Sequence, residues 1–314
     1  MTERSKGLLA MIGACVIWGL SGIYYKELSH VPPLEVLGHR TVWSLVFFVF
    51  VIAIQGRIPV VWGVLRSPRS VAMLALSAVM ISANWFVFIM SIQMGWAMQA
   101  SFGYYIFPLV AVMLGYVVLG ERLSKPQKIA VAIAAGAVLM LGIGLGNPPW
   151  ISLILAMTFG TYGLVKKKLD VGPVISVAVE VLILGPIAMI WLFGVHQFGW
   201  SGMGETDRSI AVFGTNLRDS LLLMFSGILT AVPLILFSYA ARRIALSTIG
   251  LVQYLNPTLQ FLVATFIFAE SFTKWHAIAF PLIWIGLAIF SLDSLRQDRS
   301  ARKRSIRAGT SETT

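Results

Sequence analysis

The segment LVQYLNPTLQFLV, residues 251–263, places three polar side chains and a proline inside an apolar run that covers residues 246–268. This run matches the roughly 20 residues that a helix needs to cross the hydrocarbon layer of a membrane. Polar side chains are costly there unless they face the protein interior or a water-filled cavity. We therefore expect Gln253, Tyr254 and Asn256 to point inward in a membrane protein.

The composition of the whole chain supports a membrane location. Charged residues make up 12% and apolar residues 58% of the 314 residues, whereas a soluble domain has about 25% charged residues. The apolar runs are continuous rather than alternating, which disfavours a transmembrane barrel. Ten such runs occur, at residues 7–25, 34–54, 71–92, 97–119, 127–145, 150–165, 172–193, 219–241, 246–268 and 275–293. We predict an all-α polytopic membrane protein with ten transmembrane helices.

The net charge of +11 would suggest a nucleic-acid partner in a soluble protein. Its distribution along this chain has a simpler explanation. If the N-terminus and every second loop are cytoplasmic, 19 of the 24 Lys and Arg residues fall on the cytoplasmic side, as the positive-inside rule predicts. We expect a location in the inner membrane, both termini in the cytoplasm, and no nucleic-acid partner.

The two halves of the chain resemble each other. At an offset of 149 residues, Tyr105 aligns with Tyr254 and Pro108 with Pro257, without a gap. Five spans in each half would insert the two halves in opposite directions, an arrangement typical of secondary transporters with a site near the membrane midplane.

A second alignment joins the starts of the two halves. At an offset of 141 residues, WGLSGIYYKEL at 18–28 aligns with FGTYGLVKKKL at 159–169. The predicted division is a first five-helix repeat at 1–145, a second at 146–294 and a basic tail at 295–314.

Pro108 and Pro257 lie near the centres of their predicted spans. Proline lacks an amide hydrogen and clashes with the carbonyl four residues earlier, which affects Tyr104 and Gln253 here. Irregular backbone at membrane depth is tolerated where it is buried in protein or lines a wet cavity. A packing kink would explain one proline, but two at symmetric positions favour helix breaks beside a cavity.

Glu180 is the only acid deep inside a predicted span. Acids at this depth usually face a cavity or a partner, and they often carry protons in transporters. Two roles are open for Glu180. It could couple transport to protons, or it could be a neutral side chain that joins two helices by hydrogen bonds.

Glu35, His39 and Arg40 open the second span after two prolines. Glu35 and His39 are four residues apart and share a helix face, so they can pair. The cluster is compatible with an ordinary helix start, in which Arg40 extends toward lipid headgroups. It is equally compatible with an outer gate or a point of carboxylate recognition.

Two long stretches carry a resemblance to a known family. NWFVFIMSIQMGWAMQASFGYYIFPLVAVMLGYVVLGERLSKPQ at 84–127 and TAVPLILFSYAARRIALSTIGLVQYLNPTLQFL at 230–262 resemble the drug/metabolite transporter superfamily. The resemblance is to its EamA-type branch, and within it to the RarD-like (chloramphenicol-sensitivity) subgroup. It implies ten helices in two inverted halves with cytoplasmic termini. It also implies a central cavity lined by spans one, three, four, six, eight and nine, and transport without ATP.

The residues expected to bind a substrate in this cavity are polar or aromatic. Aromatic walls accept planar or cationic solutes by stacking, although aromatic residues near span ends are more often interfacial anchors. A buried amide such as Asn84 could instead join helices, a contact worth about 1 kcal/mol or less. The predicted set is Trp18, Asn84, Trp85, Tyr104, Tyr105, Gln253, Tyr254 and Asn256.

These observations predict a secondary active transporter that moves a small metabolite or drug-like solute by alternating access. Proton coupling through Glu180 is an additional hypothesis. An integral-membrane or lipid-modifying enzyme is the alternative, but we find no clustered nucleophile and base. No motif for a cofactor or a metal occurs. The expected partners are a small-molecule substrate and the lipid bilayer, and a second copy of the chain is a further alternative.

Overall fold

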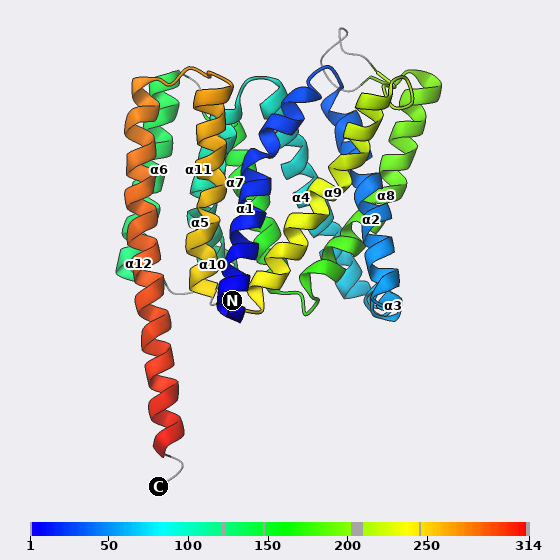
Figure 1. Ribbon diagram of the computed structural model, residues 1–314. Coiled ribbons are helices and arrows are strands. Elements are labelled where there is room, and N and C mark those ends of the chain that lie inside the picture. Colours follow the sequence, from blue (N-terminus) through cyan, green and yellow to red (C-terminus); the bar gives the residue numbers. More distant parts are fainter. Residues whose placement is uncertain (1, 121–122, 147, 202–209, 245, 312–314) are drawn as a thin grey trace.

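The computed structural model describes residues 2–120, 123–146, 148–201, 210–244 and 246–311, which form helices and no β-strand (Figure 1). The helices are α1 (Glu3–Glu27), α2 (Pro33–Ile54), α3 (Ile58–Leu65), α4 (Pro68–Gln93), α5 (Ala97–Leu119), α6 (Lys125–Leu145), α7 (Trp150–Lys167), α8 (Pro173–Phe198), α9 (Leu217–Ala241), α10 (Leu246–Gln253), α11 (Leu255–Leu262), the π-helix η1 (Val263–Ile267) and α12 (Lys274–Ser311). The all-α prediction is confirmed for this part of the chain.

Eight of the described helices are long and apolar enough to cross a membrane: α1, α2, α4, α5, α6, α8, α9 and α12. The sixth predicted span corresponds to α7, which has 18 residues and ends in two lysines. The ninth is divided into α10, α11 and η1. The protein is therefore polytopic, while its count of ten spans stays a prediction.

Local sequence signals explain where several helices begin. Ser124 and Gln127 form a reciprocal capping box at the start of α6, which satisfies two backbone donors that would otherwise lack partners. Asn216 caps α9 through its side chain, which accepts the amide of Asp219. Prolines stand in the first turn of α2, α4, α6 and α8, where a missing amide hydrogen costs nothing.

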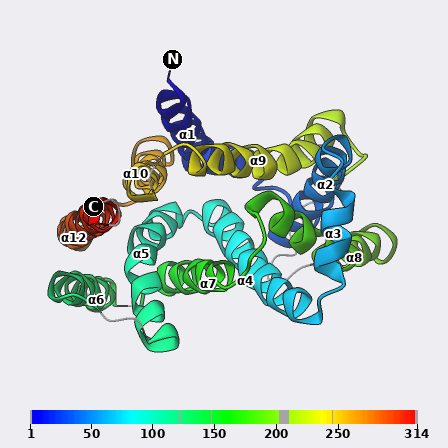
Figure 2. The ribbon, with the colours of Figure 1, turned by 90° about the horizontal axis from the view of Figure 1, so that it is seen from below.

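The helices surround a central space. Viewed along the bundle, α1, α9 and α10 lie on one side of the middle, and α4, α5 and α7 lie on the other (Figure 2). α5 and α4 both pack against α7, and α9 packs against α1 and α2. α6 and α12 pack on each other at the outer edge. Both termini lie at the same end of the bundle, the lower end in Figure 1.

Glycines allow two of these helices to approach closely. A Cβ atom at Gly227 of α9 would lie 2.4 Å from the carbonyl carbon of Trp43 in α2. Because that neighbour is backbone, it cannot move aside as a side chain could. A Cβ at Gly136 of α6, by contrast, would meet nothing within 4 Å.

We therefore expect Gly227→Ala to destabilise the protein by at least about 1–3 kcal/mol, as overpacking of a tight contact does. Gly136→Ala is the matched control and should leave stability unchanged or raise it slightly, since alanine favours helix. Thermal unfolding of both variants in detergent measures the difference. Equal stability of the two variants would contradict the close approach of α2 and α9.

Candidate functional site

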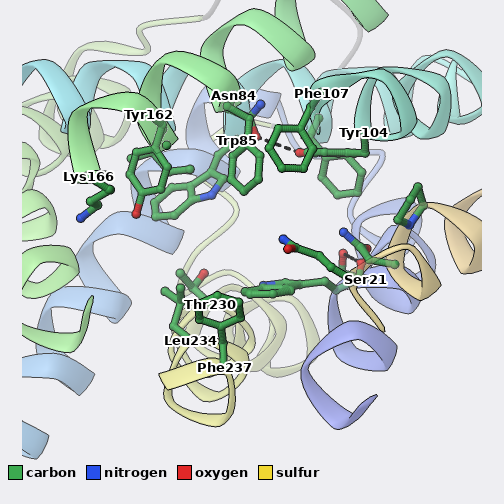
Figure 3. A pocket seen from close by; sticks show the side chains of 18 of the residues that line it. Ser21, Asn84, Trp85, Tyr104, Phe107, Tyr162, Lys166, Thr230, Leu234 and Phe237 are labelled. Atoms are coloured by element: carbon green, nitrogen blue, oxygen red, sulfur yellow. Dashed lines mark hydrogen bonds between the residues drawn. The ribbon is translucent and has the colours of Figure 1, made fainter. Parts of the chain in front are cut away.

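A cavity of about 710 Å³ lies in the middle of the bundle. Its volume is within the range of pockets that enclose small molecules. All six spans that the resemblance assigns to the wall contribute side chains to it, and α2, α8 and α12 contribute as well. Eleven of the 31 residues that line it are aromatic. In Figure 3, Trp85, Tyr104 and Phe107 of α4 and α5 lie across the cavity from Leu234 and Phe237 of α9.

Most residues of the predicted binding set line this cavity, and their role in binding stays a prediction. Tyr105 does not line it. The Tyr105 side chain is 2% exposed, shares a hydrogen bond of 2.7 Å with Thr258 Oγ1 and packs against Phe280. Consecutive residues of a helix point about 100° apart, so only one of the two tyrosines can face the cavity. The lining members are Trp18, Asn84, Trp85, Tyr104, Gln253, Tyr254 and Asn256.

Asn84 combines the two roles that its sequence position left open. Its Nδ2 donates to the carbonyl of Leu155 and to Thr158 Oγ1, both at 3.0 Å, which joins α4 to α7. Its Oδ1 accepts the hydroxyl of Tyr104 at 2.8 Å (Figure 3). Asn84 therefore joins helices and also fixes the orientation of an aromatic side chain in the cavity wall.

The two prolines line the cavity, but they affect their helices differently. α5 continues through Pro108 without interruption, so the helix break expected there is absent. A transmembrane helix can accommodate proline when neighbouring groups satisfy the freed carbonyl. Before Pro257 the span is divided at Tyr254, between α10 and α11. There the carbonyl of Tyr254 accepts the amide and the hydroxyl of Thr258, and the carbonyl of Pro257 accepts the hydroxyl of Ser101.

Glu180 has a cationic partner that sequence reasoning missed. Its carboxylate forms an ion pair with Lys166 and accepts the hydroxyl of Ser77 at 2.5 Å. Glu180 is 1% exposed and is not among the residues that line the cavity, whereas Lys166 is. In the sequence, Lys166 is one of three consecutive lysines at a predicted cytoplasmic span end. The need of a buried acid for a partner was the signal that could have found it.

The three predicted residues at the start of α2 have three different surroundings. The Glu35 carboxylate accepts the amides of Ala211 at 3.1 Å and Val212 at 3.0 Å, which holds the segment before α9 against α2. His39 stacks on Phe213 with ring centroids 4.8 Å apart. Glu35 and His39 form no ion pair with each other in the described ranges, and of the three predicted residues only Arg40 lines the cavity.

Hydrogen bonds between segments close the end of the bundle that lies opposite the termini. The Glu270 carboxylate accepts the amides of Ala97 and Met98 at the start of α5, each at 2.7 Å. Burial raises the pKa of Glu270, and these two amides lower it in part. Gln93 donates to the carbonyl of Leu28 at 3.0 Å across the same end. The first contact joins the segment after η1 to α5, and the second joins α4 to the end of α1.

The cavity reaches the other end of the bundle. Its wall includes Lys166 at the end of α7, Val171 in the following loop and Pro173 at the start of α8. This loop lies at the same end as the termini, because α7 runs toward that end (Figure 1). The cavity therefore extends toward the terminal side. Its described wall includes no residue of the segments 28–32, 94–96 and 268–273 at the opposite end, and we infer that it is closed there.

Comparisons with known proteins agree with this architecture. Residues 5–143 and residues 149–292 each match the EamA-like transporter family. An uncharacterized transporter of Vibrio cholerae serotype O1 is 40% identical over 301 residues, which cover 96% of this chain and 97% of the relative. Protein RarD of Streptomyces exfoliatus is 40% identical over 306 residues, which cover 96% and 93%.

A crystal structure of a protein with 17% sequence identity has a TM-score of 0.58 and covers 94% of this chain and 99% of the other. At that identity the similarity concerns the fold alone. The two family matches together cover most of the chain, and the two relatives cover nearly all of it. The protein is a membrane transporter of the EamA-like family, within the drug/metabolite transporter superfamily, and is similar to RarD.

Proposed function

We propose that this transporter moves a small metabolite or drug-like solute across the inner membrane by alternating access of the central cavity. The observation that carries the proposal is a cavity at membrane depth, rich in aromatic side chains, that extends to one end of the bundle and is closed at the other. Such a cavity can hold a solute of a few hundred daltons, since pockets of 300–1,000 Å³ enclose drug-sized ligands. Opening of the closed end and closure of the other would complete a transport cycle.

The cavity wall supports two repeats with opposite directions of insertion, at 1–145 and 146–294. Six lining positions of α4 and α5 map onto six lining positions of α9, α10 and α11 at the same offset of 149 residues. Related repeats would present equivalent positions to a site between them. The pairs are Ile81 and Thr230, Trp85 and Leu234, Phe88 and Phe237, Tyr104 and Gln253, Phe107 and Asn256, and Pro108 and Pro257.

The offset of 141 residues relates α1 to α7 in the same way. Lining positions of α1 map onto lining positions of α7. With α7 as the sixth span and α10, α11 and η1 as the ninth, the chain would cross the membrane ten times. Both termini would then lie in the cytoplasm, because the positive-inside rule places the basic segments there. The three pairs are Trp18 and Phe159, Ser21 and Tyr162, and Tyr25 and Lys166.

A cysteine reporter tests which side the cavity faces. Gly163 lines the cavity near its open end, and a Cβ there would meet nothing within 4 Å. The native Cys15 is fully buried, so background labelling should be low. We expect a membrane-impermeant maleimide to label Gly163→Cys from the side of the termini at least tenfold faster than from the opposite side. Equal labelling from both sides would contradict a cavity closed at one end.

Transport itself is tested with purified protein in liposomes. A library of small aromatic and amphipathic metabolites is screened first by thermal stabilisation and then by flux.

We further propose that the pair of Glu180 and Lys166 couples transport to protons, since an ionisable pair beside the cavity could exchange a proton with it. Flux should then respond to an imposed pH gradient, and Glu180→Gln should abolish that response. Gradient-independent flux in the wild type would exclude the coupling role but not transport.

A further inference from the structure

Arg40 is a buried cation in the cavity wall, and among the residues that the structure describes it has no acidic partner. Its side chain lies on α2, about 10 Å along the helix from Pro33, and the residue is 6% exposed. Nη1 donates to the Tyr25 hydroxyl at 2.7 Å, and the guanidinium lies 4.2 Å from the ring centroid of Trp85. Nε is buried and has no hydrogen-bond partner among the described residues. Within the described ranges no Asp or Glu forms an ion pair with Arg40.

The charge of the cavity wall is therefore unbalanced. Arg40 and Lys166 are the charged residues that line the cavity, and Lys166 is neutralised by Glu180. In the described part of the wall one positive charge remains, on Arg40. An unpaired charge at this depth is costly and usually belongs to a substrate or ion pathway. Contact with lipid headgroups does not explain Arg40, because a side chain that reached them would not be 94% buried inside the bundle.

The neighbours of Arg40 hold the guanidinium in a fixed orientation. Trp85 supports one face through a cation–π contact, and Tyr25 accepts a single hydrogen bond. Arginine has five N–H donors, so most of them have no acceptor in the described structure. A planar guanidinium matches a carboxylate in two parallel hydrogen bonds, whereas a lysine would act only as a point charge.

We propose that Arg40 binds the carboxylate of an anionic solute whose apolar or aromatic body lies against the cavity wall. This inference rests on the proposed function, since it assigns a substrate class to the same cavity. A monocarboxylate fits better than a phosphate, because the wall offers one uncompensated positive charge. Arg40 would hold the carboxylate near the closed end of the cavity, while the aromatic side chains below it contact the body.

Three probes with one body and different charges test the proposal. They are 3-phenylpropionate, 3-phenylpropanamide and 3-phenylpropylamine. At neutral pH the first is negatively charged, the second is uncharged and the third is positively charged. Binding to the purified full-length protein is measured by calorimetry and by thermal stabilisation. We expect the acid to bind at least tenfold more tightly than the amide, and the amine to bind most weakly. An acid that binds no better than the amide would overturn the proposal.

Variants test whether Arg40 causes the tighter binding of the acid. Arg40→Gln should weaken binding of the acid at least tenfold and leave binding of the amide unchanged, and Arg40→Lys should fall between. Arg66→Gln removes the same charge from an exposed position at the end of α3 and should bind all probes as the wild type does. Unchanged binding of the acid to folded Arg40→Gln would also overturn the proposal. If Arg40→Gln does not fold, the wild-type comparison and Arg40→Lys decide.

The failure of this inference can be told apart from the failure of the proposed function. If the amide or amine binds best and protects Gly163→Cys from labelling, the cavity binds solutes but not through a carboxylate. The same conclusion holds if none of the probes binds while other solutes of the library are transported. If no solute of any charge binds or is transported, both proposals are wrong.

Discussion

Replacing Lys166 with methionine is expected to destabilise the protein by about 3–5 kcal/mol, the usual cost of removing one partner from a buried ion pair. The Glu180 carboxylate, 1% exposed, would remain in the bundle with only the uncharged hydroxyls of Ser77 and Tyr162 as its described partners. Within the described ranges its Oε2 atom has no hydrogen-bond partner even with Lys166 present. Chemical denaturation in detergent measures the loss. Lys168→Met removes a charge from an exposed position two residues away and should change stability by no more than about 0.5 kcal/mol.

The double variant separates the pair from its surroundings. Lys166→Met combined with Glu180→Gln removes both charges and should recover a large part of the stability that Lys166→Met loses, because no uncompensated charge remains. The interaction energy of such a cycle is expected to be about 1–3 kcal/mol for residues in direct contact. Strictly additive effects of the two substitutions would contradict the ion pair.

Replacing Glu270 with alanine is expected to open the closed end of the cavity. The amides of Ala97 and Met98 at the start of α5 would lose their common acceptor, and each hydrogen bond to a charged group is worth about 1.5–3 kcal/mol. A cysteine at Ser21 in the cavity wall should then be labelled by an impermeant maleimide from the side opposite the termini, at least tenfold faster than in the protein with Glu270.

A second acid at the same end of the bundle provides the control. Glu27 is exposed and pairs with Arg218 at 2.6 Å, and exposed ion pairs contribute about 0–1 kcal/mol. Glu27→Ala should therefore leave labelling of Ser21→Cys unchanged. If Glu270→Ala lowers the unfolding temperature without a change in labelling, Glu270 supports the fold but does not close the cavity.

Length and hydropathy were enough to predict the membrane class and most of the helices. Apolar runs of about 20 residues can satisfy their backbone in lipid only as helices, so their positions follow from local composition. The short run at 150–165 and the divided run at 246–268 are the two places where this criterion does not decide. The internal offsets carried further information, because the pairs of cavity-lining positions follow them closely.

The chain alone therefore determined that this is an all-α membrane protein, and which segments carry its polar and aromatic positions. Tertiary packing decided which of those side chains meet. It separates Tyr104 from Tyr105, gives Glu180 the partner Lys166, and leaves Arg40 in the cavity while Glu35 holds a loop. The reason is physical. Hydropathy is a sum over neighbours along the chain, whereas the rotation of a helix and the partner of a buried charge depend on contacts between segments far apart in sequence.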